Sequence, residues 1–330
     1  MNIKLFSEYR LQLLGIAIIW CLLFHSGYHF SIHSFNYLVF YGWAGVDMFL
    51  LLSGLGIYFS LRKNSSIKEF YKRRFFRIYP SFVVAIVVHS IYKSYSLSDT
   101  ILDMLTINYW IGSPHIFNWF ISGLIAFYLL SPWYYKLFKR NPGVTTVVGV
   151  LFSLLLVFIT PLYLFFFITR IPIFLIGFYI GYLIAEKKET GKPNKKYVWI
   201  MFSAFVFGCI SLFLVHKNIF VSIPQTKTLC MVFIIPFLCL FIAKILSVFK
   251  NYKYPFLSFV GKYTFPLYLF YDMIADYLIR VDYALYKIVD ISSYPLWVSE
   301  IIVAVIGLIF SYFFQNMMDK ITDKIRLKLE

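Results

Sequence analysis

Ten strongly apolar stretches alternate with short polar segments along the whole chain. A helix rises about 1.5 Å per residue, so about 20 apolar residues cross a ~30 Å hydrocarbon core. The stretches run at about 11–30, 37–61, 78–92, 119–138, 144–161, 169–185, 197–215, 228–246, 263–279 and 296–317. This pattern predicts an all-α fold, a polytopic membrane bundle of about ten transmembrane helices. It forms a single domain over residues 1–330, and we expect no appended soluble domain.

The composition narrows the class of protein further. The 330 residues are 61% hydrophobic, 22% aromatic and only 14% charged, whereas soluble domains carry about 25% charged residues. These values exclude a soluble enzyme, a secreted disulfide module and a disordered chain. All four cysteines lie in apolar stretches and form no C-x-x-C pair. That distribution favours buried small side chains over disulfides or metal ligands.

The positive charge is distributed unevenly across the predicted membrane. The formal net charge is +16, and 25 of the 31 Lys and Arg residues lie on the same side as the N-terminus. Basic residues are retained on the cytoplasmic side, so both termini are predicted to be cytoplasmic. Because the charge is scattered over six cytoplasmic segments without a binding-module motif, we expect no nucleic-acid partner.

A few ionisable side chains fall inside the apolar stretches. Each costs at least ~2.5–3.5 kcal/mol near the bilayer centre, so each is a candidate functional group. They are His25, Asp47, Asp272, Asp276 and Glu300, with Arg170 at the mouth of the sixth stretch.

His25 and Asp47 are predicted to lie at similar depth on adjacent antiparallel helices. A hydrogen bond from the imidazole to the carboxylate would orient His25 as a general base. The alternative is a buried polar pair that locks two helices together, and the residues alone leave both open. His29 and His33 follow at four-residue steps, which would place them near the His25 face, although His33 is expected to lie already outside the helix. No Cys or carboxylate lies nearby to complete a ligand set, so no metal site is predicted.

The cytoplasmic segment 70–80 combines basic and aromatic residues. Seven Lys or Arg residues lie between 62 and 77. On a helix, Arg73 and Arg77 share a face, and Arg74 is three residues from Arg77. A cluster of guanidinium groups suits a phosphate-bearing ligand. The alternative is an ordinary positive-inside anchor, for which the interleaved aromatic residues are equally typical.

Taken together and in order, six motifs resemble the acyltransferase-3 family of bacterial integral-membrane acyltransferases. The motifs are Gly15-Ile16-Ala17-Ile18 leading to His25; Gly42-Trp43-Ala44-Gly45-Val46-Asp47-Met48-Phe49 ending in Leu52-Ser53-Gly54; Phe70-Tyr71-Lys72-Arg73-Arg74-Phe75-Phe76-Arg77-Ile78-Tyr79-Pro80; Asn118-Trp119-Phe120-Ile121-Ser122; Arg170-Ile171-Pro172-Ile173-Phe174 with Gly177 and Gly181; and Gly261-Lys262-Tyr263-Thr264-Phe265-Pro266-Leu267-Tyr268-Leu269. The resemblance covers nearly the whole chain.

The resemblance implies transfer of an acyl group, usually acetyl from acetyl-CoA, to sugars of envelope polysaccharides. His25 matches the family's essential first-helix histidine, and Arg74 and Arg77 match its R-x-x-R motif. The chain departs from the family at two positions. Leu14 stands where many members carry Arg or Lys, although Arg10 lies one turn earlier. Tyr271 stands where many members carry His.

We therefore expect a multi-pass acyltransferase, of O-acetyltransferase type, in the bacterial cytoplasmic membrane. His25, oriented by Asp47, would remove the proton of the acceptor hydroxyl; an acyl-histidine intermediate is the variant route. No cofactor is expected to be tightly bound, because acyl-CoA is a donor substrate. The expected binding residues are Arg73, Arg74, Arg77 and Tyr71 for the coenzyme, and Trp119 and Arg170 for a polysaccharide or lipid-linked sugar acceptor.

Two other functions compete with the acyltransferase. A transporter or flippase of lipid-linked sugars often shows an internal repeat, and none is visible in this sequence. A sugar polymerase is expected to carry a large outer catalytic loop, but the longest outer loop here, about 93–118, is short.

Overall fold

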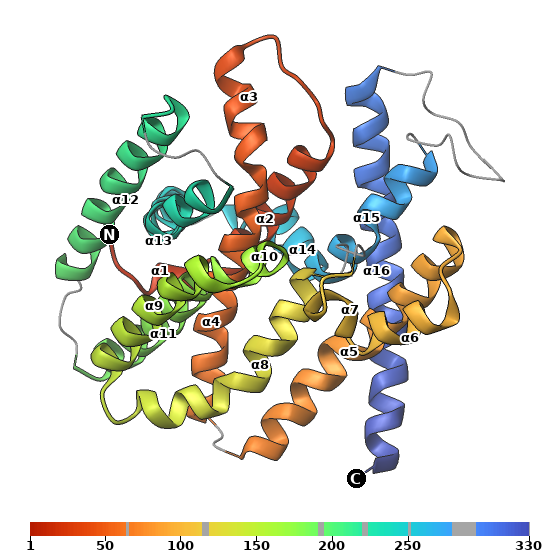
Figure 1. The fold of residues 1–330 in the computed structure, drawn as a ribbon, viewed down its shortest axis with the longest axis horizontal. Helices are drawn as coiled ribbons and strands as arrows, with labels where there is room; N and C mark the ends of the chain where they lie inside the picture. Colours follow the sequence, from red (N-terminus) through yellow and green to blue (C-terminus); the bar gives the residue numbers. More distant parts are fainter. Residues whose placement is uncertain are drawn as a thin grey trace.

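The computed structural model describes residues 1–63, 66–113, 119–190, 195–219, 224–249, 252–278 and 295–329. Every regular element in these ranges is a helix, which confirms the all-α prediction (Figure 1). Asn118 of the fourth motif and the basic residues Lys192, Lys250, Arg280 and Lys287 lie outside the described residues.

Each of the ten predicted stretches falls on a helix. These helices are α2 (Arg10–His25), α4 (Gly45–Lys63), α5 (Ile67–Lys93), α8 (Trp119–Phe138), α9 (Pro142–Ile159), α11 (Ile171–Thr190), α12 (Lys195–His216), α13 (Pro224–Val248), α15 (Thr264–Leu278) and α16 (Leu296–Leu329). Within the described residues, seven helical segments are long and apolar enough to cross a membrane. They contain α4, α5, α9, α11, α12, α13 and α16. The chain is therefore a multi-pass membrane protein.

Short helices connect these elements. They are α1 (Leu5–Glu8), α3 (His33–Phe40), η1 (Tyr41–Ala44), α6 (Leu97–Met104), α7 (Ile107–Trp110), η3 (Leu162–Leu164), α10 (Phe165–Ile168) and α14 (Pro255–Lys262).

The first long helix ends earlier than its apolar stretch predicts. Helix α2 ends at His25, and Gly27 takes a positive φ of 64° in the turn that follows, a conformation that glycine adopts without steric cost. The expectation that His29 lies near the His25 face is therefore wrong, because α2 ends before it, whereas His33 lies outside α2 as expected.

The basic segment 70–80 is helical and belongs to α5. Helix α5 begins at Ile67, after an N-cap in which the Ser66 side chain accepts a hydrogen bond from the backbone N–H of Glu69. This Ser-x-x-Glu sequence is typical of a helix start, and the helix continues through Pro80. The arginines of the segment therefore have fixed directions around a helix axis.

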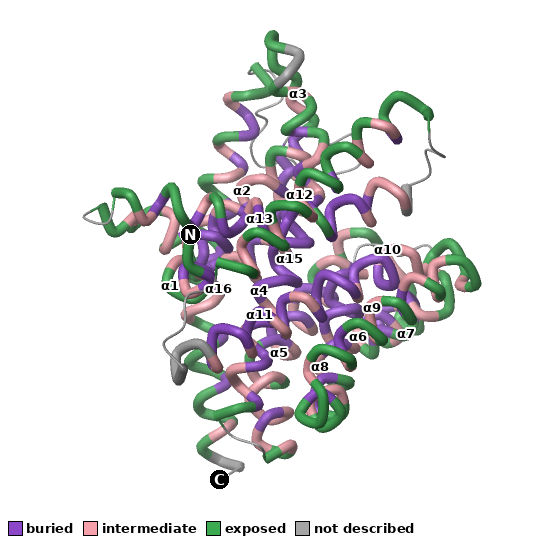
Figure 2. The backbone as a smooth tube through the Cα atoms, turned by 90° about the vertical axis from the view of Figure 1, so that its left-hand side faces the viewer, coloured by how far each residue is buried: buried purple, intermediate pink, exposed green. Residues whose placement is uncertain are grey.

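Helices α4 and α11 form the centre of the bundle. Within their apolar windows 78% and 67% of residues are buried, against 11% for α9 and for α12. Figure 2 shows the buried residues gathered in the middle of the molecule. Gly54 of α4 and Gly177 of α11 allow the contact between the two helices, because a Cβ on either would overlap a backbone carbonyl oxygen of the other helix. Small residues at such interfaces are typical of membrane helices. The exposed apolar faces of α9 and α12 are suited to lipid.

A second close contact joins α2 to α14. A Cβ on Gly15 would overlap the carbonyl oxygen of Leu257, and a Cβ on Gly261 would overlap that of Leu11. Since α15 follows α14 directly, this contact fixes the start of α15 against α2. It brings two segments from opposite ends of the chain together around the candidate site.

Candidate active site

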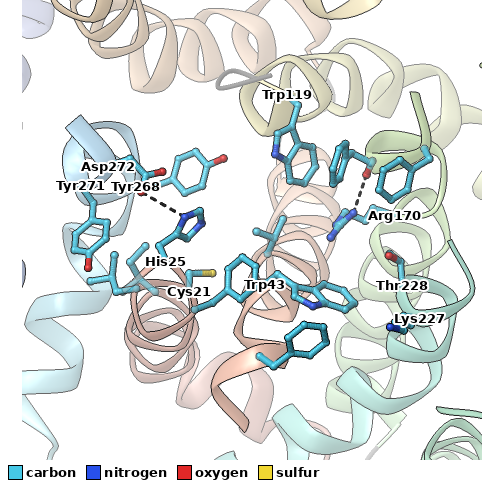
Figure 3. A pocket seen from close by; sticks show the side chains of 17 residues that line it. Cys21, His25, Trp43, Trp119, Arg170, Lys227, Thr228, Tyr268, Tyr271 and Asp272 are labelled. Carbon is cyan, nitrogen blue, oxygen red and sulfur yellow. Dashed lines mark hydrogen bonds and ion pairs between the residues drawn. The ribbon is translucent and has the colours of Figure 1, made fainter. Parts of the chain in front are cut away.

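The first cavity has a volume of about 740 Å³ and lies between the C-terminal half of α2 and the middle of α15 (Figure 3). It brings together four of the residues singled out from the sequence, His25, Trp119, Arg170 and Asp272. Its remaining lining is largely aromatic and apolar, with Lys227 and Thr228 contributed by α13. A pocket of this size, with a few polar groups in an apolar wall, is typical of a small-molecule site.

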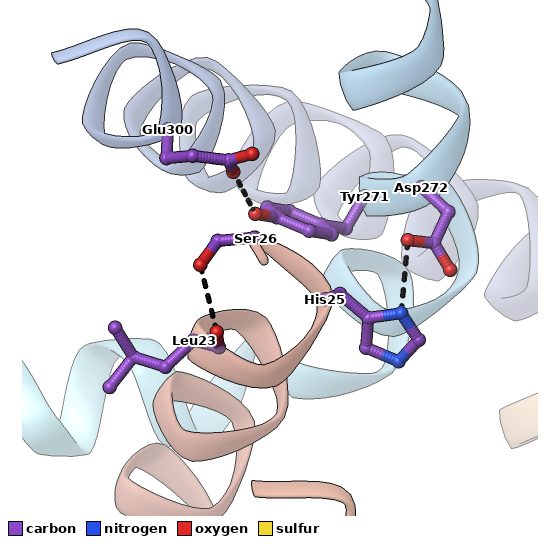
Figure 4. Close-up of polar contacts among 6 residues, drawn as sticks. All are labelled: Leu23, His25, Ser26, Tyr271, Asp272 and Glu300. Atoms are coloured by element: carbon purple, nitrogen blue, oxygen red, sulfur yellow. Dashed lines mark hydrogen bonds and ion pairs between the residues drawn. The ribbon is translucent and has the colours of Figure 1, made fainter. Parts of the chain in front are cut away.

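The partner of His25 is Asp272 on α15. The imidazole Nδ1 lies 3.3 Å from Oδ1 of Asp272, and both side chains are half-exposed to the cavity (Figure 4). A carboxylate at Nδ1 favours the tautomer with its proton on that atom, which leaves Nε2 as the basic nitrogen. The arrangement suits a general base, provided that Nε2 reaches an acceptor hydroxyl.

The predicted hydrogen bond between His25 and Asp47 is wrong. Asp47 is fully buried, and neither of its carboxylate oxygens accepts a hydrogen bond from a described residue. Its charge is instead matched by Arg170, whose Nε lies 3.3 Å from Oδ1 of Asp47. The depth argument failed because equal depth on adjacent helices does not fix the direction in which each side chain points around its helix.

Arg170 is held in one orientation by several contacts. It follows α10, and its Nη1 donates a hydrogen bond to the carbonyl oxygen of Phe166 at 3.1 Å. Its guanidinium carbon lies 4.8 Å from the ring centre of Trp119 and 5.8 Å from that of Trp43. Cation–π contacts of this kind are stronger when the groups are desolvated, and Arg170 is 3% exposed. Arg170 therefore forms part of the cavity wall opposite His25, and the buried Asp47 behind it matches its charge.

Two further acidic residues of the apolar stretches also have partners on other helices. Tyr271 donates a hydrogen bond to Glu300 of α16 at 2.6 Å (Figure 4). Lys93, at the end of α5, lies 3.0 Å from Asp276. The Tyr271 hydroxyl is therefore bound to Glu300 and does not replace the histidine that many family members carry at this position. The two contacts join α15 to α16 and to α5 on either side of Asp272.

The second cavity has a volume of about 610 Å³ and lies near the N-terminal end of α2. Its lining includes the cationic residues Arg10, Arg74, Arg77 and Lys262 and one carboxylate, that of Asp319. Arg10, one turn before Leu14, extends over Gly56 and makes two 3.4 Å hydrogen bonds to the carbonyl oxygen of Leu52. Four cations around one cavity favour a ligand with several negative charges.

Arg74 and Arg77 line this cavity, whereas Arg73 and Tyr71 do not. Arg74 is also fixed by the rings of Phe70 and Tyr128, at 5.4 and 5.2 Å from its guanidinium carbon. The Tyr71 hydroxyl donates a 2.7 Å hydrogen bond to the carbonyl oxygen of Leu129 on α8. Arg74 and Arg77 are three positions apart, which places both on one face of α5. The Tyr71 hydrogen bond joins this helix to α8.

The two cavities lie at opposite ends of α2 and share one wall residue. Arg10 and His25 are the first and last residues of the 16-residue helix, so they lie about 22 Å apart along its axis. Tyr268 of α15 lines both cavities. A flexible ligand that passes Tyr268 could have one end at the arginines and the other at His25.

The fold and its two cavities define a polytopic membrane protein with an internal site for chemistry. The chain belongs to the acyltransferase-3 family: the family described as an acyltransferase domain matches residues 13–315. The chain is also similar to the acyltransferase MdmB of Streptomyces mycarofaciens, with 32% identity over 118 residues. That alignment covers 31% of this chain and 30% of MdmB. No solved structure matches the chain. The chain is therefore a multi-pass membrane member of this family.

Proposed function

We propose that the protein transfers an acyl group, of which acetyl is the simplest, from cytoplasmic acyl-CoA to a hydroxyl of a cell-envelope or exported polysaccharide. The observation that carries the proposal is the pair of cavities that meet at Tyr268, one with four cationic residues and one with His25. Coenzyme A has the matching shape, because its phosphates are at one end and its thioester is at the end of a long flexible arm.

The donor would bind from the side on which most basic residues lie. Arg74, Arg77, Arg10 and Lys262 would hold its phosphates, while the pantetheine arm passes Tyr268 and brings the thioester to His25. The small residue Ser53 in the lining of the second cavity leaves space for this arm. The distribution of basic residues predicts cytoplasmic termini, and in that orientation this cavity would open toward the acyl-CoA pool of a bacterial cytoplasm.

The acceptor would occupy the aromatic part of the first cavity. Trp43, Trp119 and Phe166 provide flat apolar surfaces around the cavity, and Arg170 provides a charged donor next to them. His25, oriented by Asp272, would take the proton of the acceptor hydroxyl as its oxygen attacks the thioester carbonyl. Positioning two substrates in one enclosed site lowers the entropic cost of their reaction.

The test is transfer by the full chain reconstituted in lipid, with acyl-labelled CoA and envelope glycans as acceptors. We expect label in the glycan fraction with wild-type protein and none with His25→Ala at equal membrane expression. In cells, deletion of the gene should remove acyl groups from surface glycans and leave the polymer in place. Loss of the whole polymer would instead identify a transporter or polymerase, and transfer by His25→Ala would refute the proposed base.

A further inference from the structure

Tyr268 of α15 faces both cavities. It is the one residue common to the linings of the 740 Å³ and 610 Å³ cavities. It precedes Asp272 by four residues, so the two side chains share one face of α15. Asp272 contacts His25 on that face. The Tyr268 side chain therefore lies where the pantetheine arm of the donor would pass from the second cavity to the first. It is one turn of α15 from Asp272, the partner of His25.

The hydroxyl of Tyr268 is directed into the first cavity (Figure 3). Its ring is fixed by an edge-on contact with Phe120, with ring centres 4.9 Å apart and planes at 63°. An ordered ring gives the hydroxyl a defined position. A donor held in place before reaction stabilises developing charge without reorganisation.

The hydrogen-bonding capacity of this hydroxyl is unused by the described part of the chain. Three hydroxyl side chains line the first cavity, those of Thr228, Tyr268 and Tyr271. Tyr271 donates to Glu300, and Thr228 has an interaction within the protein. Tyrosine hydroxyls in protein interiors usually have a partner, so a free phenol facing a cavity is suited to a ligand.

We propose that Tyr268 is a catalytic residue that donates a hydrogen bond to the thioester carbonyl oxygen and stabilises the oxyanion of the tetrahedral intermediate. The inference rests on the acyl-CoA function proposed above. Tyr268 keeps its proton throughout and forms no covalent bond. His25, and not Tyr268, accepts the proton of the acceptor hydroxyl.

The reaction balances with these two groups. His25 Nε2 takes the proton of the acceptor hydroxyl as that oxygen forms a bond to the thioester carbon, and the carbonyl π electrons move to its oxygen. The oxyanion accepts the Tyr268 hydrogen bond. It then re-forms the carbonyl as the carbon–sulfur bond breaks, and the imidazolium returns its proton to the coenzyme A thiolate. The products are the acyl ester and free coenzyme A.

The test uses full-length protein in lipid vesicles with acetyl-CoA as donor and a glycan acceptor on which wild-type is active. Tyr268→Phe removes one oxygen and leaves the ring. We expect kcat to fall by about 10²–10³-fold, the usual effect of removing one oxyanion donor, with the KM for acetyl-CoA unchanged. The matched control is Tyr263→Phe, since Tyr263 is a buried tyrosine between α14 and α15 that lines neither cavity. It should retain wild-type kcat.

A second acyl donor distinguishes two explanations for a loss of activity in Tyr268→Phe, namely lost stabilisation of the oxyanion and a general change of structure. Fluoroacetyl-CoA forms an intrinsically more stable oxyanion, so Tyr268→Phe should lose less activity with it than with acetyl-CoA. An equal loss with both donors would overturn the oxyanion role, as would wild-type kcat in Tyr268→Phe. A raised KM with unchanged kcat would also overturn it, and would make Tyr268 a contact for the pantetheine arm. Failure of the acyltransferase function itself is distinguishable, because wild-type protein would then transfer nothing.

Discussion

The imidazole of His25 and the carboxylate of Asp272 lie 3.3 Å apart, although they come from the first and the ninth of the ten apolar stretches. His25 is the last residue of α2, and Asp272 is in the middle of α15. The close contact of Gly15 with α14 fixes these two helices next to each other. The pair therefore depends on the tertiary packing of chain ends that are far apart in sequence.

Replacing Asp272 should weaken His25 as a base. In Asp272→Asn the amide no longer favours the proton on Nδ1, so we expect kcat to fall substantially, within the about 10²–10⁴-fold range that general-base catalysis contributes. The KM for acyl-CoA should stay constant. The measurement is steady-state transfer by the reconstituted protein over a range of donor concentrations.

The control for Asp272 is Asp276→Asn, one turn further along α15. Asp276 pairs with Lys93 at 3.0 Å and lies outside the lining of both cavities, so this variant should keep most of its kcat. Equal activity of the two Asn variants would contradict the assignment of Asp272 to His25.

Replacing either of the two arginines of α5 that line the second cavity should weaken binding of the acyl-CoA donor and leave the chemical step largely unchanged. Arg74→Ala and Arg77→Ala each remove a charge-assisted hydrogen-bond donor, for which a loss of about 1.5–3 kcal/mol is typical. The KM for acyl-CoA should rise about tenfold or more in each variant, and kcat with saturating donor should change less. Arg73→Ala is the internal control, because Arg73 does not line this cavity. A similar rise in KM for Arg73→Ala would indicate a general effect of surface charge.

The buried pair of Asp47 and Arg170 should be coupled energetically. Removing either partner leaves an unmatched charge at a site that is 0–3% exposed, and breaking such a pair costs about 3–5 kcal/mol. Asp47→Leu and Arg170→Met should each lower the unfolding temperature in detergent. The double variant should be more stable than either single variant, because no charge then remains buried. Additive losses would show that the two side chains act independently.

Adding a side chain at the glycine contact between α4 and α11 should destabilise the protein. In Gly177→Ala the new Cβ would overlap the carbonyl oxygen of Leu51, so the helices must separate and the unfolding temperature should fall. Gly143→Ala is the matched control, since the nearest atom to its Cβ would be the Asn141 side-chain oxygen at 3.9 Å. Thermal unfolding of both variants in the same detergent measures the difference. An unchanged unfolding temperature for Gly177→Ala would contradict the tight packing.

Much of this protein follows from the sequence. The apolar stretches predict where the main helices lie, because a helix satisfies its own backbone hydrogen bonds within lipid. Among the described residues, seven helical segments are long and apolar enough to cross a membrane. The cost of burying ionisable groups identified His25, Asp272 and Arg170 as candidate functional residues. The six ordered motifs indicated the family, and the family match over residues 13–315 confirms it.

The pairing of those groups is a property of the tertiary structure. Hydropathy gives the depth of a residue, but the partner of His25 depends on the rotation of each helix and on which helices are neighbours. That is why Asp47 was expected beside His25 and instead pairs with Arg170, while Asp272 takes its place. The same holds for Arg73 and Arg74, which are adjacent in sequence but differ in their access to the second cavity.

The sequence by itself determined the helices, the family and the identity of the ionisable residues that are unfavourable inside a membrane. The tertiary structure decided which of those residues meet, and it brought Tyr268 to the junction of two cavities that no local pattern reveals. The physical reason is that burial in lipid constrains each helix separately, through its length and apolarity. A site is formed by side chains from several helices, and close contacts such as Gly15 with α14 and Gly54 with α11 set their relative positions.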